Sequence, residues 1–265
     1  MNRFKQCFAT VANLKRPAYI PFLMLADPSP HESLRVINAV IESGIDALEL
    51  GIPFSDPIAD GPIVAQAAAR ACEHQLSTKN FLTMIQTIRE NHPNLPIGIL
   101  VYANLVFRFG INTFYQQAKR SGVDAVLIPD LPFLEAKPYL QAAKDNDVDV
   151  VLLATPSCQL PELENVATHS RGFTYLVTRP GVTGIDKPSQ LNQAHTMTKT
   201  LQTLNAAPVV FGFGIKNALD VEQAYQAGAQ GVIIGSALIE AIHRLNIAQC
   251  TSQDITELTR SFFVD

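Results

Sequence analysis

Two acidic residues, Glu49 and Asp60, lie close together in the sequence near one expected strand end, as paired acid and base chemistry requires. The strand-like run 45–50 ends near Glu49, and the loop that follows carries Asp60 among three prolines between positions 53 and 62. A charged side chain in an apolar strand is costly unless it has a partner or a chemical task. A second acid on a stiff loop nearby predicts paired acid and base chemistry.

Each of these acids also has a structural interpretation. Glu49 could pair with a buried Arg or Lys, and Asp60 could cap a helix that begins near Pro62. Asp56 has the same ambiguity, because Ser-Asp-Pro also favours turns. Strand alternation places Glu49 on the face that carries small or polar residues, which suits a barrel lumen. Desolvation there is expected to raise the pKa of Glu49 toward neutrality.

The elements that must position these acids are short, mostly β-branched apolar runs separated by segments with helical spacing. Such runs predict strands that are buried on both faces. The eight runs are 18–24, 45–50, 96–102, 123–128, 148–153, 173–177, 208–211 and 231–234.

A local pattern repeats before three of the runs and supports a repeated strand-and-helix architecture. Ser-Gly-Ile-Asp-Ala-Leu at 43–48 resembles Ser-Gly-Val-Asp-Ala-Val at 121–126, and residues 227–232 form a weaker copy. Each copy predicts a glycine-capped helix end followed directly by a strand. The predicted fold class is therefore α/β, a single (β/α)8 TIM barrel with an extra N-terminal helix, covering residues 1–265 as one domain. A doubly wound open sheet is the alternative, but no G-x-G-x-x-G follows the first run.

Composition narrows the partners and the compartment. The 265 residues carry a net charge of −4 with no run of like charges, so nucleic acid and anionic membrane surfaces are not expected partners. Four separated cysteines without a C-x-x-C pair favour a reducing cytoplasm. The first residues lack the apolar core of a signal peptide, and no apolar run reaches transmembrane length.

Glycines at the ends of the last three expected strands predict a phosphate site. They occur in 181–184, in Gly212 and Gly214, and in Gly235, which precedes Ser236 and an expected helix. Backbone N–H groups at such turns and at a helix N-terminus bind anions, and phosphate sites after strands 7 and 8 are frequent in this fold.

Absences narrow the reaction class. None of the eight runs contains a Lys, so a Schiff-base aldolase lacks its nucleophile. The six His residues form no metal-ligand pattern, no G-x-S-x-G is present, and there is no Trp for a sugar platform. The reaction class that remains after these exclusions is acid and base chemistry by carboxylates on a phosphorylated substrate.

The sequence resembles the α subunits of tryptophan synthase along nearly its whole length. The matching motifs are Pro21-Phe22, Leu48 to Pro62, Tyr102 to Leu105, Gly181 to Gly184, Gly212 to Ile215 and Gly235 to Ala237. The resemblance implies a lyase of tryptophan biosynthesis that cleaves indole-3-glycerol phosphate to indole and glyceraldehyde 3-phosphate. It implies that Glu49 is the acid and base, and that Asp60 accepts the indole N–H and stabilises a ring cation.

The same resemblance implies the substrate-binding residues. Tyr175 positions the side chain of the substrate, and Thr183 lies on a closing loop. The apolar pocket and the phosphate site are expected to contain Phe22, Leu100, Leu127, Phe213, Gly184, Gly214, Gly235 and Ser236. Pro129 and Pro180 depart from the pattern of the family, and Pro180 is expected to stiffen the closing loop.

The implied partner is a pyridoxal-phosphate-dependent β subunit in an α2β2 heterotetramer. It would face the loop 55–59 and the segment around Asp130. The chain itself is expected to hold no cofactor and no metal. Three other functions remain open from the sequence: a regulatory subunit with little turnover, a free-standing lyase and a phosphosugar isomerase.

Overall fold

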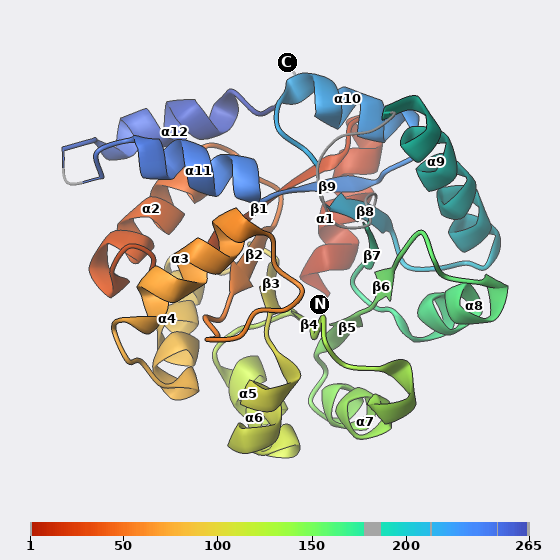
Figure 1. Ribbon diagram of the computed structural model, residues 1–265, viewed down its shortest axis with the longest axis horizontal. Coiled ribbons are helices and arrows are strands. Elements are labelled where there is room, and N and C mark those ends of the chain that lie inside the picture. Colours follow the sequence, from red (N-terminus) through yellow and green to blue (C-terminus); the bar gives the residue numbers. More distant parts are fainter. Residues whose placement is uncertain (1, 178–186, 213, 248, 264–265) are drawn as a thin grey trace.

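Parallel strands form a nearly closed barrel, as the alternating runs predicted (Figure 1). The computed structural model describes residues 2–177, 187–212, 214–247 and 249–263. The strand order is β5-β4-β3-β2-β1-β9-β8-β7-β6, with every pair parallel. The strands are β1 Ala18–Met24, β2 Leu48–Gly51, β3 Ile97–Leu100, β4 Ala125–Leu127, β5 Asp149–Val151, β6 Leu153–Ala154, β7 Thr174–Val177, β8 Val209–Gly212 and β9 Gly231–Ile234.

The expected fifth strand is divided into β5 and β6. β5 pairs with β4, whereas β6 pairs with β7, so the barrel closes through one continuous stretch of chain. Between them, the N–H of Leu152 donates to Ser170 Oγ at 3.1 Å instead of to a strand. A side-chain acceptor thus satisfies the backbone group that the ladder leaves out.

The helices surround the strands in a ring (Figure 1), as the (β/α)8 prediction requires. Helical spacing predicted the inward faces correctly, since Phe81, Met84, Ile85 and Ile88 are all buried. The helices are α1 Arg3–Asn13, α2 Pro30–Glu42, α3 Pro62–Cys72, α4 Thr78–Asn91, α5 Ala103–Phe109, α6 Ile111–Arg120, the short 3-10 helix η1 Phe133–Glu135, α7 Lys137–Asp145, α8 Leu160–His169, α9 Lys187–Thr203, α10 Ala218–Gln226, α11 Ser236–Arg244 and α12 Ser252–Arg260.

The expected extra N-terminal helix is α1, and it packs against the amino-terminal end of the barrel. Phe4 is fully buried, with its ring centroid 5.3 Å from that of Phe173. Arg3 Nη1 lies 2.7 Å from Asp124 Oδ1, at the start of β4. At this end of the barrel the apolar side chain is buried and the charged groups are paired, whereas active sites in this fold lie at the other end.

The repeated sequence pattern has a structural cause. Gly44, Gly122 and Gly228 all have positive φ, at 94°, 86° and 98°, so each ends its helix in a conformation that favours glycine. Two residues later, a side-chain oxygen accepts the N–H of a residue near the start of the preceding strand. The three bonds are Tyr19 N to Asp46 at 2.8 Å, Ile97 N to Asp124 at 2.9 Å and Val209 N to Gln230 at 3.0 Å.

Within the described residues, none of the helices combines the length and the apolar character needed to cross a bilayer.

Candidate active site

Glu49 lies near the carboxyl end of β2 and is only 2% exposed. In register it pairs with Phe22 of β1 and Gly98 of β3. Burial, and secondarily the charge of Asp60, raises the pKa of Glu49 from 4.5 to about 8. This rise in pKa is the effect expected for a carboxyl group that is removed from water. Glu49 is therefore mostly protonated at neutral pH.

Asp60 lies on the loop between β2 and α3 and does not cap the helix. The N-cap of α3 is Gly61, which makes no side-chain cap bond, so the capping interpretation was wrong. Burial raises the pKa of Asp60 from 3.8 to about 6, while a hydrogen bond from Tyr102 opposes that rise. At neutral pH Asp60 is therefore ionised where Glu49 is protonated, so the two acids can serve different chemical roles.

Tyr102 is a site residue to which sequence reasoning assigned no role. Its hydroxyl accepts the N–H of Ala59 at 3.1 Å and hydrogen bonds to the side chain of Asp60. Its ring stacks on Phe54, with centroids 5.1 Å apart. Tyr102 thus fixes the carboxylate loop to the end of the third strand. The available signal was a polar aromatic residue at an expected strand end, the position where barrel enzymes place functional groups.

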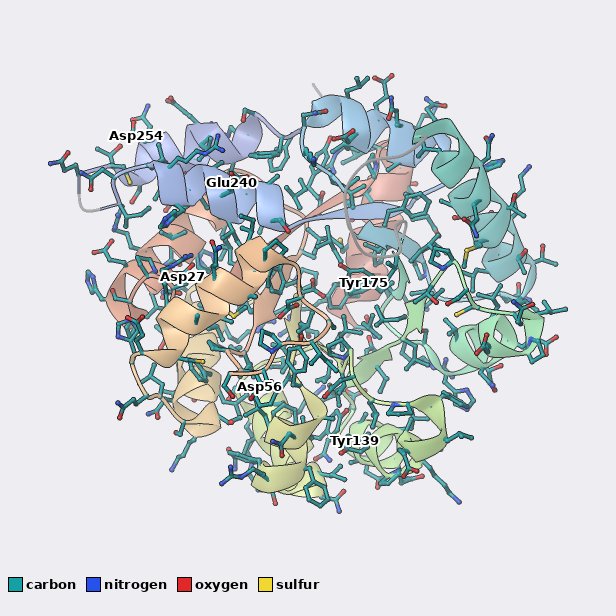
Figure 2. All side chains as sticks on the ribbon, viewed as in Figure 1. Asp27, Asp56, Tyr139, Tyr175, Glu240 and Asp254 are labelled. Atoms are coloured by element: carbon teal, nitrogen blue, oxygen red, sulfur yellow. The ribbon has the colours of Figure 1, made fainter. Side chains whose placement is uncertain are left out.

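Two glycines leave room for aromatic rings at the mouth. A Cβ on Gly51 would lie 2.7 Å from Phe22 Cζ, and a Cβ on Gly212 would overlap the ring of Tyr175. Tyr175 is 6% exposed, and after burial the charges of Glu49 and Asp60 raise its pKa. Figure 2 places Tyr175 near the centre of the ring of helices. The missing side chains of the two glycines therefore let both rings lie close to the acids.

Leu100 and Leu127 lie side by side at the ends of β3 and β4. They are register partners, and Leu100 also pairs with Gly51, two residues beyond Glu49. Strand alternation puts all of them on the face of Glu49. Together with Phe22, they provide an apolar surface beside the acids.

The described part of the expected phosphate site lies after β8 and β9. Gly214 has a φ of 90°, and Gly235 is the N-cap of α11 without a side-chain cap bond. Ser236 is exposed in the first turn of that helix. These features suit anion binding by backbone N–H groups. The predicted residues Thr183, Gly184 and Phe213, and the departure at Pro180, lie outside the described residues.

Asp56 is not brought to the acids. It is exposed and accepts a hydrogen bond from Ser55 Oγ at 2.6 Å. Its charge is not among the groups that shift the pKa of Glu49 or Asp60. The alternative interpretation of Asp56 as a loop residue therefore holds.

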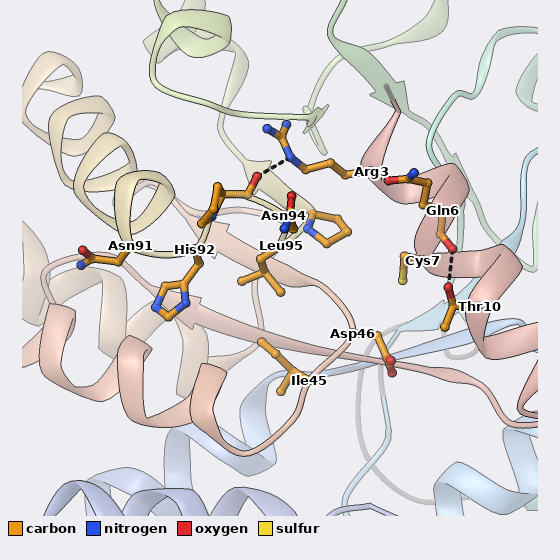
Figure 3. Close-up of a pocket in the computed structure, with 12 residues that line it drawn as sticks. Arg3, Gln6, Cys7, Thr10, Ile45, Asp46, Asn91, His92, Asn94 and Leu95 are labelled. Atoms are coloured by element: carbon orange, nitrogen blue, oxygen red, sulfur yellow. Dashed lines mark hydrogen bonds between the residues drawn. The ribbon is translucent and has the colours of Figure 1, made fainter.

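A cleft of about 500 Å³ at the other end of the barrel does not offer comparable chemistry (Figure 3). It lies between α1 and the segments that precede β2 and β3, and its charged groups are already paired. Asp46 binds Arg16, and Arg3 binds Asp124 and the carbonyl of Pro93. Active sites in this fold lie at the opposite, carboxyl end of the strands.

The described residues contain no group of three or more His, Cys, Asp or Glu side chains placed to hold a metal ion. The arrangement at the mouth offers a protonated buried carboxyl group, an ionised carboxylate, an apolar surface and a backbone anion site. Such a set suits proton transfer to a phosphorylated, partly apolar substrate.

Comparison with known proteins finds relatives that share this architecture and part of the sequence. Residues 8–262 match the profile of the family described as "Tryptophan synthase alpha chain". The tryptophan synthase alpha chain of Yersinia pseudotuberculosis is 44% identical over 260 residues, covering 98% of this chain and 96% of the relative. The structure resembles tryptophan synthase subunit alpha from Legionella pneumophila, with a TM-score of 0.88, 27% identity and coverage of 99% and 97%. It also resembles a chain of the aminoacrylate-bound tryptophan synthase from M. tuberculosis, with a TM-score of 0.85, 27% identity and coverage of 99% and 100%.

The raised pKa of Glu49 predicts a pH dependence of folding stability. The native state keeps a proton that the unfolded chain releases, so wild-type stability falls as the pH rises from 4.5 to about 8. Replacing Glu49 by Gln removes this loss, on the order of 4 kcal/mol. Urea unfolding at pH 5 and pH 8.5 measures it, with the exposed Glu90→Gln as the matched control. Equal pH dependence in all three proteins would contradict a raised Glu49 pKa.

Proposed function

The chain belongs to the tryptophan synthase alpha chain family, and on this premise we propose that Glu49 and Asp60 carry out its reaction. As a lyase of tryptophan biosynthesis, it cleaves indole-3-glycerol phosphate to indole and glyceraldehyde 3-phosphate. The observation that carries the proposal is the pair of acids, whose pKa values of about 8 and about 6 leave one protonated and one ionised.

In the proposed mechanism Glu49 transfers protons in both directions. Its carboxyl group first protonates the ring carbon that bears the side chain, giving an indoleninium cation. The resulting carboxylate then takes the proton from the adjacent side-chain hydroxyl, and the carbon–carbon bond breaks as its electrons enter the ring. A pKa of about 8 suits this exchange, because neither the acid nor the base form is strongly disfavoured near pH 7.

Asp60 stabilises the cation in this proposal. Its carboxylate accepts the indole N–H, which becomes more acidic as positive charge develops in the ring. The hydrogen bond from Tyr102 helps keep Asp60 ionised and fixes its loop. A preorganised charge of this kind acts most strongly in the transition state.

The remaining predicted residues bind and enclose the substrate. The apolar surface of Phe22, Leu100 and Leu127 receives the indole ring, with Phe213 completing it, and Tyr175 positions the side chain. Thr183 acts on the loop that closes over the site, where exclusion of water strengthens the electrostatic contacts. The N-terminus of α11 supports phosphate binding, and the anion site as a whole consists of Gly184, Gly214, Gly235 and Ser236.

A β subunit is the proposed partner, in an α2β2 complex in which pyridoxal phosphate is held by β. Support comes from the M. tuberculosis relative, a tryptophan synthase solved in an aminoacrylate-bound form. The segments that follow β2, β3 and β4 expose large apolar side chains, which is typical of protein interfaces. Their exposures are 82% for Ile58, 69% for Phe107, 39% for Phe133 and 93% for Leu134. Asp130 lies between them and accepts the N–H of Ala103 at 2.8 Å.

Residues 1–265 are proposed to act as one domain in the cytoplasm. One hydrophobic core runs from Phe4 to Phe262. All four cysteines are free, as expected in a reducing compartment.

Replacing either acid tests the mechanism. Glu49→Gln is expected to lower indole release about a hundredfold to ten-thousandfold, the range of general acid and base catalysis. Asp60→Asn is expected to lower it about a hundredfold or more through lost charge stabilisation. Both are measured with and without β subunit, and Glu90→Gln serves as control. Full activity of Glu49→Gln would exclude the mechanism, whereas no wild-type indole release even with β would favour the regulatory alternative.

The two pKa values predict the pH dependence of turnover. Asp60 must be ionised and Glu49 protonated at the first step, so kcat should fall below pH about 6 and above pH about 8. In Asp60→Asn the acid limb should disappear while the alkaline limb remains. Single-turnover indole formation between pH 5 and pH 9.5 measures this, and an acid limb unchanged in Asp60→Asn would contradict the assignment.

The exposed apolar surface predicts the effect of a charge on β binding. Ile58→Asp is expected to weaken the complex tenfold or more, since a buried charge would remain unpaired at the interface. Calorimetric titration with β measures the affinity. Leu14→Asp is the control, because Leu14 is 58% exposed after α1, at the other end of the barrel. A larger loss for Leu14→Asp than for Ile58→Asp would place the interface elsewhere.

A further inference from the structure

A second cavity lies outside the barrel, in the layer between the strands and the helices. It has a volume of about 310 Å³ and is bounded by β4, β5, β6, α6, α7 and α8. We propose that this shell cavity binds a small, mostly apolar molecule with one hydrogen-bonding group, separately from the reaction site.

The inner wall of the shell cavity comes from the outward faces of the strands. Val126 and Ile128 flank Leu127 in the sequence and line the cavity, whereas Leu127 lies on the opposite face, toward the lumen. Val150 and Leu152 continue this wall across the division between β5 and β6. Neither Glu49, Asp60 nor Tyr175 borders the space, so the sheet itself separates the two sites.

The outer wall is open between two helices that do not pack closely. α6 packs against α7 and α8 against α9, but α7 and α8 form no comparable contact. Figure 1 shows α7 and α8 on neighbouring sides of the barrel. Tyr139 and Leu140 of α7 and Val166 of α8 face the space from either side. The cavity therefore arises where neighbouring helices leave the strands uncovered.

Tyr115 supplies a polar group inside this apolar space. The residue is 1% exposed and lines the cavity, and its hydroxyl has no hydrogen-bond partner among the described residues. Burial, with a smaller contribution from Tyr139, raises its pKa, so the hydroxyl stays protonated. A hydroxyl that borders an apolar cavity and has no protein partner there is available to donate one hydrogen bond and to accept another. A ligand with an N–H or an oxygen atom would satisfy it.

The rim offers a passage to solvent. Glu162 and Asn165 of α8 line the cavity and are exposed. The ring of Phe133, which also lines the cavity, lies against His169 at the end of α8, with centroids 5.1 Å apart and an interplanar angle of 65°. Phe133 is half-exposed, and rotamers of exposed side chains exchange rapidly.

Size and lining define the class of ligand. A volume of about 310 Å³ falls at the lower end of small-molecule pockets, which suits a planar molecule of one or two rings. No Lys or Arg is among the described residues that line the space, so no cationic side chain there favours a phosphorylated ligand. Indole has the required shape and a single N–H donor, and 5-bromoindole is a probe of the same chemistry.

Site-resolved NMR tests the proposal in the full chain. The six tyrosines are labelled at the ring carbon that bears the hydroxyl and are assigned by single Tyr→Phe substitutions. Titration with 5-bromoindole is expected to shift the Tyr115 and Tyr139 signals together, with one dissociation constant. Tyr175 reports binding at the barrel mouth, which is a separate event. Shifts confined to Tyr175, or no shift up to the solubility limit, would overturn the proposal.

A matched pair of variants separates binding from a structural role. Tyr115→Phe is expected to raise the dissociation constant that is read at Tyr139 about threefold to tenfold, which is the effect of losing one hydrogen bond. Tyr225→Phe, at a 37% exposed position on α10, should leave it unchanged. Bromine anomalous scattering in crystals soaked with 5-bromoindole should place the probe beside Tyr115. Equal affinity in both variants, or bromine found only in the barrel mouth, would contradict the assignment.

Discussion

The burial of one carboxyl group sets the constraints on this structure. Glu49 is 2% exposed inside a ring of parallel strands, and desolvation makes its ionised form costly. The residues around Glu49 bury its carboxyl group and shift its pKa. Gly51 and Gly212 leave room for the rings of Phe22 and Tyr175, and a loop brings a second, less buried acid close enough to raise its pKa further. The same desolvation that destabilises the fold supplies an acid that is protonated near neutral pH.

The two ends of the barrel divide stability from chemistry. At the amino-terminal end, α1 covers the barrel, and Asp46, Asp124 and Gln230 each hold the beginning of the preceding strand. Their repeated positions explain why the pattern appears three times in the sequence. At the carboxyl end, the polar groups are placed to contact a substrate, and the pKa values of Glu49 and Asp60 are both raised. The fold can tolerate this because its rigidity is established elsewhere.

The sheet separates two spaces with different chemistry. Inside the barrel, acids, glycines and a helix N-terminus suit a phosphorylated substrate, whereas the shell cavity is apolar apart from Tyr115 and a few groups near its rim. Phe133 links the shell cavity to the exposed apolar surface that we assign to the β subunit, because it lines the former and is 39% exposed on the latter. A ligand in the shell cavity would thus contact the side of the chain that faces its partner.

The sequence by itself determined the barrel, the extra helix, the inward faces of helices and the positions of Glu49 and Asp60, because strand length, helical period and glycine caps are local signals. Only the tertiary structure decided that the fifth strand is divided at Leu152, that Asp60 binds Tyr102 rather than capping α3, and that Tyr115 faces a cavity. These features depend on partners distant in the chain or on how helices pack, and no local pattern encodes either. The two pKa values depend likewise on burial, which arises when separate strands close around one side chain.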